Sequence, residues 1–281
     1  MSRWRGTWTR VEFGEKYAFV VYDRWGKKFQ IVVDTQEAIK FKTGKDVAAD
    51  EVIVHPYVFS DINKGTLAST DDLRKMVYEV AIDKISKKLE RELSEEERKK
   101  IRDEIEDWSD EKIHAEAAKI VLEKGYLKLP KNVRDRLIEE KMGEILRYIQ
   151  KYAINPATNA PYPPSKLEEA FKKALAKGIN IDPLMETRGV IPIVIKYLQD
   201  IIPIRLELII TKVRIPPAYT GQLYGKILQF ATMKNQKWLE DGTLEAELEV
   251  PAGVFLRLTN LLTETTRGTV KLEIITRKTI Q

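Results

Sequence analysis

The stretch RLELIITKVRI, residues 205–215, decides how the last third of this chain folds, because its alternation of apolar, β-branched residues predicts a strand. Two prolines follow it and open a helix, after which MKNQKWL and TLEAELEV predict a hairpin around an Asp–Gly turn. A further helix and a last strand, TVKLEIITR, complete the order β-α-β-β-α-β. This is the order of the split βαβ unit, so we predict a ferredoxin-like domain over residues 205–281.

The segment before this domain has the periodicity of a central three-helix bundle, over residues 130–204. The first helix begins at Pro130 and keeps apolar residues on one face as far as Ile149. We expect Gly178 to end the second helix and Asp182 to begin the third.

The first two bundle helices are joined by NPATNAPYPPS, residues 155–165, which holds four prolines where one helix breaker would suffice. Proline fixes the backbone angle φ and restricts the unfolded chain, so we expect this joint to set the angle between its helices. The alternative is a stable turn with no further purpose. After the joint, Ser165 and Glu168 predict a capping box at the start of the second helix.

Residues 1–129 predict a mixed α/β domain, which places the whole chain in the α+β class. KYAFVVYDRWGKKFQIVV, residues 16–33, predicts a hairpin with its turn at residues 23–26. DINKG, residues 61–65, predicts a second turn, and the periodicity becomes helical soon after it.

The helical part of this domain contains a strongly charged segment at about residues 77–108. Between residues 76 and 112 there are thirteen acids and nine bases, a net charge of −4, so the rest of the chain carries +9. Ser94 and Glu97 predict a capping box within this segment. We interpret it as a solvated helical hairpin, and His114 on the following helix as an ordinary surface residue.

The composition argues against several classes of function. The chain has 281 residues, 43% of them hydrophobic, and a formal net charge of +5, which is typical of a globular protein and permits nucleic-acid binding. There is no cysteine, and the two histidines are far apart, so we expect neither thiol chemistry nor a metal site. Because no glycine-rich phosphate-binding motif occurs, we expect no cofactor and no enzymatic activity.

The sequence also argues against a membrane protein. The most apolar segment, residues 189–213, is interrupted by charged residues, so it does not predict a membrane span. The first ten residues lack the apolar region of a signal peptide. We therefore expect a cytoplasmic protein that binds no membrane.

The remaining candidates for function are basic and aromatic residues that can contact RNA. Arginine and lysine neutralise phosphates, and tryptophan stacks on bases. The candidates in the N-terminal arm and in the two predicted turns are Arg3, Trp4, Arg5, Lys27, Lys28 and Lys64. The alternative for each is an ordinary surface residue, because terminal arms often fray and turns carry lysines routinely.

Four stretches, in chain order, resemble one protein family: GKKFQIVV, VFSDINKGTLASTDDL, YAINPATNAPYPPSKLEEA and IPPAYTGQLYGKI. On these residues the chain is similar, over nearly its whole length, to the archaeal branch of the SBDS (Shwachman–Bodian–Diamond syndrome) ribosome-maturation proteins. The NP-x-T-x-x-PYPPS joint and the NKGTLAS turn are the most specific of them. The family plan of a mixed N-terminal domain, a three-helix middle and a ferredoxin-like end agrees with the three segments above, apart from the charged insertion.

The resemblance implies a ribosome-assembly factor that binds the rRNA of the large subunit. It also implies joint action with a translational GTPase related to elongation factor two, which releases the anti-association factor, initiation factor six. Through the motifs GKKF and NKG it makes Lys28 and Lys64 the first candidates for rRNA contacts, followed by Lys27. We expect a monomer. An adaptor that binds free RNA during processing or degradation is the alternative.

Overall fold

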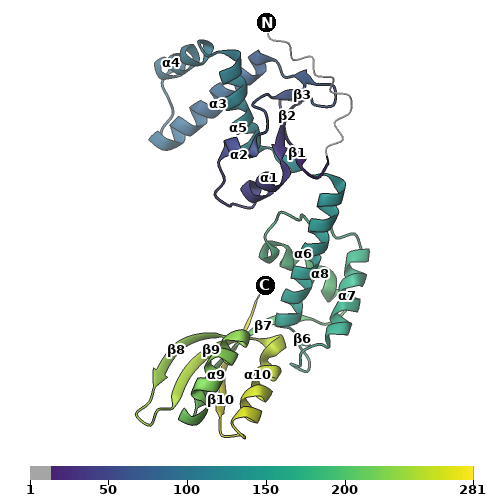
Figure 1. Cartoon of the computed structure of the whole chain (residues 1–281), viewed down its shortest axis with the longest axis vertical. Helices are drawn as coiled ribbons and strands as arrows, with labels where there is room; N and C mark the ends of the chain where they lie inside the picture. Colours follow the sequence, from purple (N-terminus) through teal and green to yellow (C-terminus); the bar gives the residue numbers. More distant parts are fainter. Residues whose placement is uncertain (1–13, 281) are drawn as a thin grey trace. The chain divides into compact units, whose positions relative to one another are not determined.

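The computed structural model describes residues 14–280, and the chain divides between Arg136 and Leu137 into two compact units (Figure 1). The elements of the first unit are β1 (Tyr17–Arg24), β2 (Lys27–Asp34), α1 (Thr35–Lys42), α2 (Ala49–Val52), β3 (Phe59–Asp61), β4 (Thr66–Leu67), α3 (Thr70–Leu89), α4 (Glu95–Glu106), α5 (Asp110–Lys124) and β5 (Tyr126–Lys128). Helix α6 (Lys131–Tyr152) continues into the second unit. Within the part of the chain that the structure describes, no helix is both long and apolar enough to cross a lipid bilayer.

The first unit is built on a five-stranded sheet in the order β4-β3-β2-β1-β5. Strands β1 and β2 form the predicted hairpin, and their pairing continues as far as Arg24 with Lys27, so that only Trp25 and Gly26 make the turn. One face of the sheet packs against helices. Phe29 of β2, for example, is buried in one core with residues of α3 and α5.

The charged segment contributes to this core, which the prediction of a solvated hairpin did not foresee. Val77 and Val80 of α3 and Ile105 of α4 are buried among the residues of the first hydrophobic core. Only part of residues 77–108 is therefore a solvated surface. The charged residues still lie outward, because helical periodicity places apolar and charged side chains on opposite faces.

His114, predicted to lie on the surface, is buried on α5 with 5% of its area exposed. Its Nδ1 accepts a hydrogen bond from the backbone N–H of Val58 at 3.1 Å, and its ring meets that of Tyr57 edge-on. The prediction was wrong because residue 114 shares a helix face with the buried Ala118 and Val121, one and two turns further along. Burial lowers the pKa of the His114 imidazole.

Acid should destabilise the protein through His114. Its pKa is lower in the folded than in the unfolded protein, where the ordinary value is 6.5, so the unfolded chain binds the proton more readily. The stability that the neutral His114 imidazole contributes is fully present above pH 6.5. It is lost as the pH falls through the pKa that His114 has in the folded protein. We expect the free energy of urea unfolding to fall more steeply from pH 7 to pH 5 in the wild type than in His114→Asn, whose amide oxygen still accepts from Val58. Equal slopes would contradict this role.

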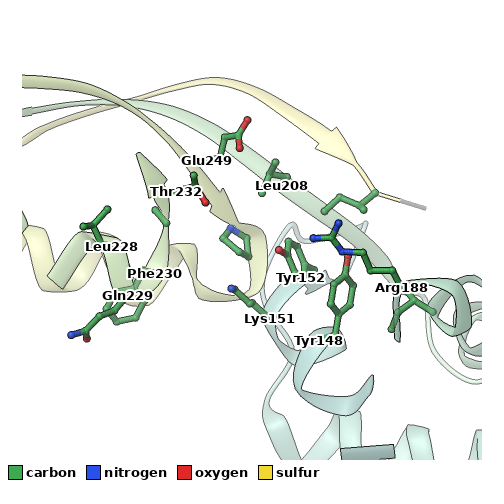
Figure 2. Close-up of a pocket in the computed structure, with 14 residues that line it drawn as sticks. Tyr148, Lys151, Tyr152, Arg188, Leu208, Leu228, Gln229, Phe230, Thr232 and Glu249 are labelled. Atoms are coloured by element: carbon green, nitrogen blue, oxygen red, sulfur yellow. The ribbon is translucent and has the colours of Figure 1, made fainter. Parts of the chain in front are cut away.

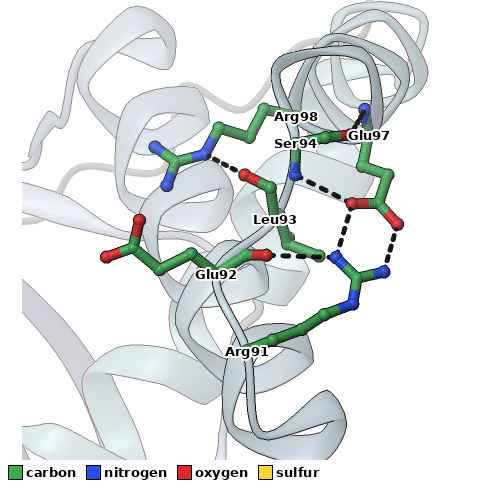
Figure 3. Close-up of polar contacts among 6 residues, drawn as sticks. All are labelled: Arg91, Glu92, Leu93, Ser94, Glu97 and Arg98. Carbon is green, nitrogen blue, oxygen red and sulfur yellow. Dashed lines mark hydrogen bonds and ion pairs between the residues drawn. The ribbon is translucent and has the colours of Figure 1, made fainter.

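Helix α4 begins with the predicted capping box, which is confirmed (Figure 3). The Ser94 hydroxyl accepts from the N–H of Glu97 at 3.3 Å, and the Glu97 carboxylate accepts from the N–H of Ser94 at 2.8 Å. Arg91 donates to both carboxylate oxygens of Glu97, at 3.0 and 2.7 Å. Arg91 and the Ser94 N–H together lower the pKa of the Glu97 carboxyl to about 2.

The other end of α4 is held by a side chain of α3. The last turn of α4 has no basic residue to balance the negative end of the helix dipole. Arg74 supplies that charge, because its guanidinium donates to the carbonyl oxygens of Ile105 at 2.6 Å, Glu106 at 2.9 Å and Trp108 at 2.9 Å. One partly buried arginine thus joins the charged helix to the core of the first unit.

Removing this arginine should loosen α4. Arg74→Met keeps the apolar stem and removes the charged donor from three carbonyls, so we expect the free energy of unfolding to fall by about 2 kcal/mol. Backbone hydrogen exchange in α4 should rise at the same time. Lys99→Met, on the exposed surface of α4, is the control and should change the stability by less than about 0.5 kcal/mol. Similar effects of both substitutions would show that Arg74 does not hold the helix.

The second unit contains the predicted bundle helices and the predicted ferredoxin-like end. Its elements after α6 are β6 (Ala153–Ile154), α7 (Pro164–Ala176), α8 (Thr187–Gln199), β7 (Arg205–Ile215), α9 (Pro217–Phe230), β8 (Thr232–Trp238), β9 (Leu244–Pro251), α10 (Ala252–Thr265) and β10 (Lys271–Thr279). The sheet has the antiparallel order β10-β7-β9-β8, with α9 and α10 packed on one face. The α+β class and the β-α-β-β-α-β order are confirmed.

Two predicted helix starts in the bundle were wrong. No side chain makes a capping hydrogen bond at the start of α7, so the capping box of Ser165 and Glu168 is not formed. The helix begins at Pro164, because the fixed φ of proline suits the first helical position. Helix α8 begins at Thr187 rather than Asp182, whose carboxylate accepts from a backbone N–H two residues on, at 2.9 Å, in a turn before the helix.

The proline joint folds back on itself. The N–H of Asn155 donates to the carbonyl of Ala160 at 2.9 Å, and the N–H of Asn159 donates to that of Asn155 at 2.8 Å. Asn159 has a φ of 54°, a left-handed conformation that asparagine tolerates better than most residues. The Tyr162 hydroxyl donates to the carbonyl of Pro203, so the joint is also attached to the chain that leads into β7.

The bundle and the ferredoxin-like end meet at the C-terminal end of α6. The chain passes from α6 directly into β6, which pairs with the start of β7 through Ile154 and Arg205. At the start of α10, Gly253 lies so close to α6 that a Cβ there would be 2.4 Å from the carbonyl oxygen of Gln150 and 2.8 Å from that of Lys151. Only glycine permits this approach, since both obstacles are backbone atoms.

A methyl group at residue 253 should therefore destabilise the second unit. Gly253→Ala forces α10 away from α6, and overpacking of this kind costs about 1–3 kcal/mol of unfolding free energy. The control is Gly225→Ala within α9, where a Cβ meets no atom within 4 Å. Alanine there should leave the stability unchanged or raise it by up to about 1 kcal/mol. Thermal and chemical unfolding of both variants tests this, and a harmless Gly253→Ala would contradict it.

Candidate nucleic-acid interface

Two turns lie at the same end of the sheet in the first unit. Strand β3 pairs antiparallel with β2 through Phe59 and Gln30, so the end of β3 lies level with the start of β2. The β1–β2 turn and the turn after β3 are therefore neighbours. The side-chain oxygen of Gln30 also accepts from the N–H of Ile62 at 3.0 Å, which attaches the second turn to β2.

The second turn is organised by Asp61 and presents Lys64. The Asp61 carboxylate accepts from the N–H of Asn63 at 3.1 Å and from that of Lys64 at 3.3 Å. Gly65 closes the turn with a φ of 64°, which glycine adopts without strain. The Lys64 ammonium lies 3.4 Å from Asp61, and its side chain is 79% exposed. A pair this exposed contributes little stability, so the ammonium can exchange its partner.

The two lysines of the first hairpin differ in their side-chain contacts. Lys27 lies on the face of the sheet toward α3 and donates to both carboxylate oxygens of Asp72, at 2.8 and 2.6 Å. Lys28 points to the opposite face, since side chains alternate along a strand. It is exposed, and among the described residues no acid forms an ion pair with it. A phosphate would have to displace Asp72 to reach Lys27, whereas Lys28 is available.

The other predicted contacts fall elsewhere. Arg3, Trp4 and Arg5 lie outside the described residues, so their role stays a prediction. Lys28 and Lys64 are brought to the same end of one sheet by the pairing of β2 with β3. They remain the best-placed pair of the predicted set.

A third feature of this end of the sheet was missed from the sequence. Trp25 lies at the tip of the β1–β2 hairpin, with the Lys75 ammonium 4.5 Å and the Arg24 guanidinium 5.5 Å from its ring centroid. The signal that could have revealed it is a bulky residue before Gly26 in a turn where asparagine or aspartate is usual. Lys75 could not have been found this way, because only folding brings α3 beside the hairpin.

The second unit has a polar pocket of about 500 Å³ between α6, α8 and the ferredoxin-like sheet (Figure 2). Tyr148 and Tyr152 of α6 lie with ring centroids 4.6 Å apart, and burial raises the pKa of the Tyr152 hydroxyl. Lys151, Arg188 and Glu249 also line it. Within residues 14–280 no group of three or more His, Asp or Glu side chains is placed to hold a metal ion. The pocket offers charge and hydrogen bonds but no paired nucleophile and base.

Comparison with known protein families accounts for most of the chain. The SBDS N-terminal domain matches residues 16–100, SBDS domain II matches residues 143–207, and the SBDS C-terminal domain matches residues 210–277. The chain belongs to the archaeal branch of the SBDS family. The matched SBDS N-terminal domain includes both turns with Lys28 and Lys64.

Relatives of this SBDS chain are similar to it over almost their full lengths. A "Ribosome maturation protein SDO1 homolog" from Aeropyrum pernix is 28% identical over 249 residues, which cover 89% of this chain and 92% of the relative. One of the same name from Methanothermobacter thermautotrophicus is 29% identical over 251 residues, covering 89% and 93%. "Ribosome maturation protein SBDS" from Caenorhabditis elegans is 23% identical over 264 residues, covering 94% and 90%.

Proposed function

We propose that this protein is a ribosome-maturation factor that binds the rRNA of the large ribosomal subunit through the turn end of its N-terminal sheet. Family membership supports the first part, because relatives matched over nine tenths of their length are named ribosome maturation proteins. The second part is carried by one observation: β2–β3 pairing brings two exposed lysines, Lys28 and Lys64, to one end of a sheet. Two exposed cations at one end of a sheet can both contact the phosphate backbone of RNA.

We further propose that it acts with a GTPase related to elongation factor two to release initiation factor six from the large subunit. The support is the resemblance of the sequence to the SBDS plan over all three segments. Contacting rRNA and a protein partner at two places on the large ribosomal subunit suits a chain that folds as two separate units. The basic end of the first unit would hold rRNA, and the second unit would be left for protein partners.

The chemistry of the described residues favours binding over catalysis. The turn end offers cations, backbone N–H groups and an exposed indole, all of which suit phosphates and bases. It includes no nucleophile hydrogen-bonded to a base, as bond cleavage would require. We propose a binding factor without a cofactor, which acts as a monomer in the cytoplasm.

Charge reversal at both lysines should weaken binding to the large subunit. Lys28→Glu with Lys64→Glu removes two phosphate contacts, so the slope of log K against log salt should fall by about two. Affinity should fall about ten-fold or more per contact at 0.1 M salt. The fold should be unaffected, because both side chains are exposed and their loss costs less than about 0.5 kcal/mol. Salt-dependent co-sedimentation with purified large subunits measures both quantities.

The matched control is Lys45→Glu with Lys128→Glu. It makes the same change of charge in the same unit, but Lys128 pairs with Phe19, away from the turn end of the sheet. Equal losses in both double variants would indicate nonspecific attraction and would contradict this site. Unimpaired binding of naked RNA without binding of subunits would favour the free-RNA adaptor instead. In a release assay, only the turn-end variant should slow GTP-dependent release of initiation factor six.

A further inference from the structure

The tip of the β1–β2 hairpin has an unusual residue for its backbone conformation. Trp25 has a φ of 51° and Gly26 a φ of 70°, so both turn residues are left-handed, as in a type I′ hairpin turn. Glycine, asparagine and aspartate are the usual occupants of such a turn. A bulky side chain is strained there, because its Cβ lies too close to the following carbonyl.

Packing inside the protein does not account for this strain. The indole meets Phe29 at its edge, with ring centroids 6.2 Å apart, and 37% of the area of Trp25 remains exposed. A tryptophan that served the core would be buried more completely. Strained residues that persist on the surface are concentrated at binding and active sites.

The surroundings of the indole are cationic. Lys75 lies 4.5 Å from the ring centroid, and among the described residues no acid forms an ion pair with it. Arg24 is 5.5 Å from the centroid and is engaged with Glu79 at 3.0 Å. Lys28 lies three residues along the chain at the same end of the sheet. An exposed aromatic ring with a free ammonium group beside it is a combination that binds single-stranded nucleic acid.

We propose that Trp25 is a stacking platform for one unpaired base of RNA, and that Lys75 binds a phosphate beside that base. The proposal rests on the function proposed above, since it extends the surface of Lys28 and Lys64 around the hairpin tip. It also specifies the ligand: a loop, bulge or strand end, because bases in a continuous duplex are stacked on each other and present no free face.

Replacing the strained residue by the one that suits the turn separates binding from folding. Trp25→Asn should raise the midpoint of thermal unfolding of the full chain, because asparagine suits a type I′ turn. It should also weaken binding to purified large subunits and to a single-stranded RNA oligonucleotide by about five-fold or more. The salt slope should stay the same, since no charge is lost. Trp25→Phe, which keeps a ring, should retain most of the affinity.

Lys75→Met is the complementary variant. It keeps the apolar stem beside the indole and removes the ammonium, so it should lower the salt slope by about one. Weaker affinity with an unchanged salt slope in Trp25→Asn would indicate a base stacked on the ring. A smaller salt slope in Lys75→Met would indicate a phosphate bound to the lysine. An unchanged slope in Lys75→Met would overturn the phosphate role.

Tryptophan fluorescence provides a test that does not depend on stability. Single-stranded RNA should quench the emission of the wild type more than that of Trp25→Phe, whereas an RNA duplex should show little difference. Equal quenching, or full affinity of Trp25→Asn, would overturn the proposal for Trp25. If the proposal for Trp25 fails in this way but the Lys28 and Lys64 double variant still binds weakly, the function proposed above stands without a role for Trp25. Full binding by both variants would overturn the two together.

Discussion

The second unit depends on the close approach of the α10 backbone to the carbonyl end of α6. Gly253 permits this contact, and the short pairing of β6 with β7 fixes the same junction from the other side. Ile154, Ile209 and Ala252 are buried together there in a small core of their own. The bundle and the ferredoxin-like end are thus joined by backbone contacts, which tolerate less variation than contacts between flexible side chains.

The proline joint is attached to this junction between the bundle and the ferredoxin-like end. Ile154 forms a β-bridge with Pro161, and Tyr162 reaches the carbonyl of Pro203 just before β7. The joint therefore lies beside the strands that connect the bundle to the sheet. Restricting its backbone stabilises the loop directly and supports the pairing of β6 with β7. The same short loop thus holds both the prolines that fix its φ angles and the residues that attach it to the junction.

The cations of the first unit differ in whether their charge is engaged with a carbonyl or an acid. Arg74, Arg24 and Lys27 are engaged with carbonyls or acids of the helical layer, where they hold α3, α4 and the hairpin together. Lys28 and Lys75 have no acid partner among the described residues, and Lys64 has only an exposed one. Net charge counts both groups equally. Only unengaged cations are free to attract phosphates, and at the turn end these are Lys28, Lys64 and, beside the hairpin tip, Lys75.

Local signals in the sequence determined the hairpins, the Ser94 capping box and the β-α-β-β-α-β order, because turn residues, prolines and hydrophobic periodicity act over a few residues. They also identified Lys64 in the second turn and Lys28 close to the first. The tertiary structure alone decided that His114 is buried, that Val77 and Ile105 share a core, and that Arg74 holds the end of α4. It also decided that Lys27 is occupied by Asp72 while Lys75 lies against Trp25. The hydrogen bonds of Arg74 and His114 join residues 31 and 56 positions apart, and the bond of Lys27 to Asp72 spans 45. No local pattern specifies them, since they exist only once the sheet and its helices have packed.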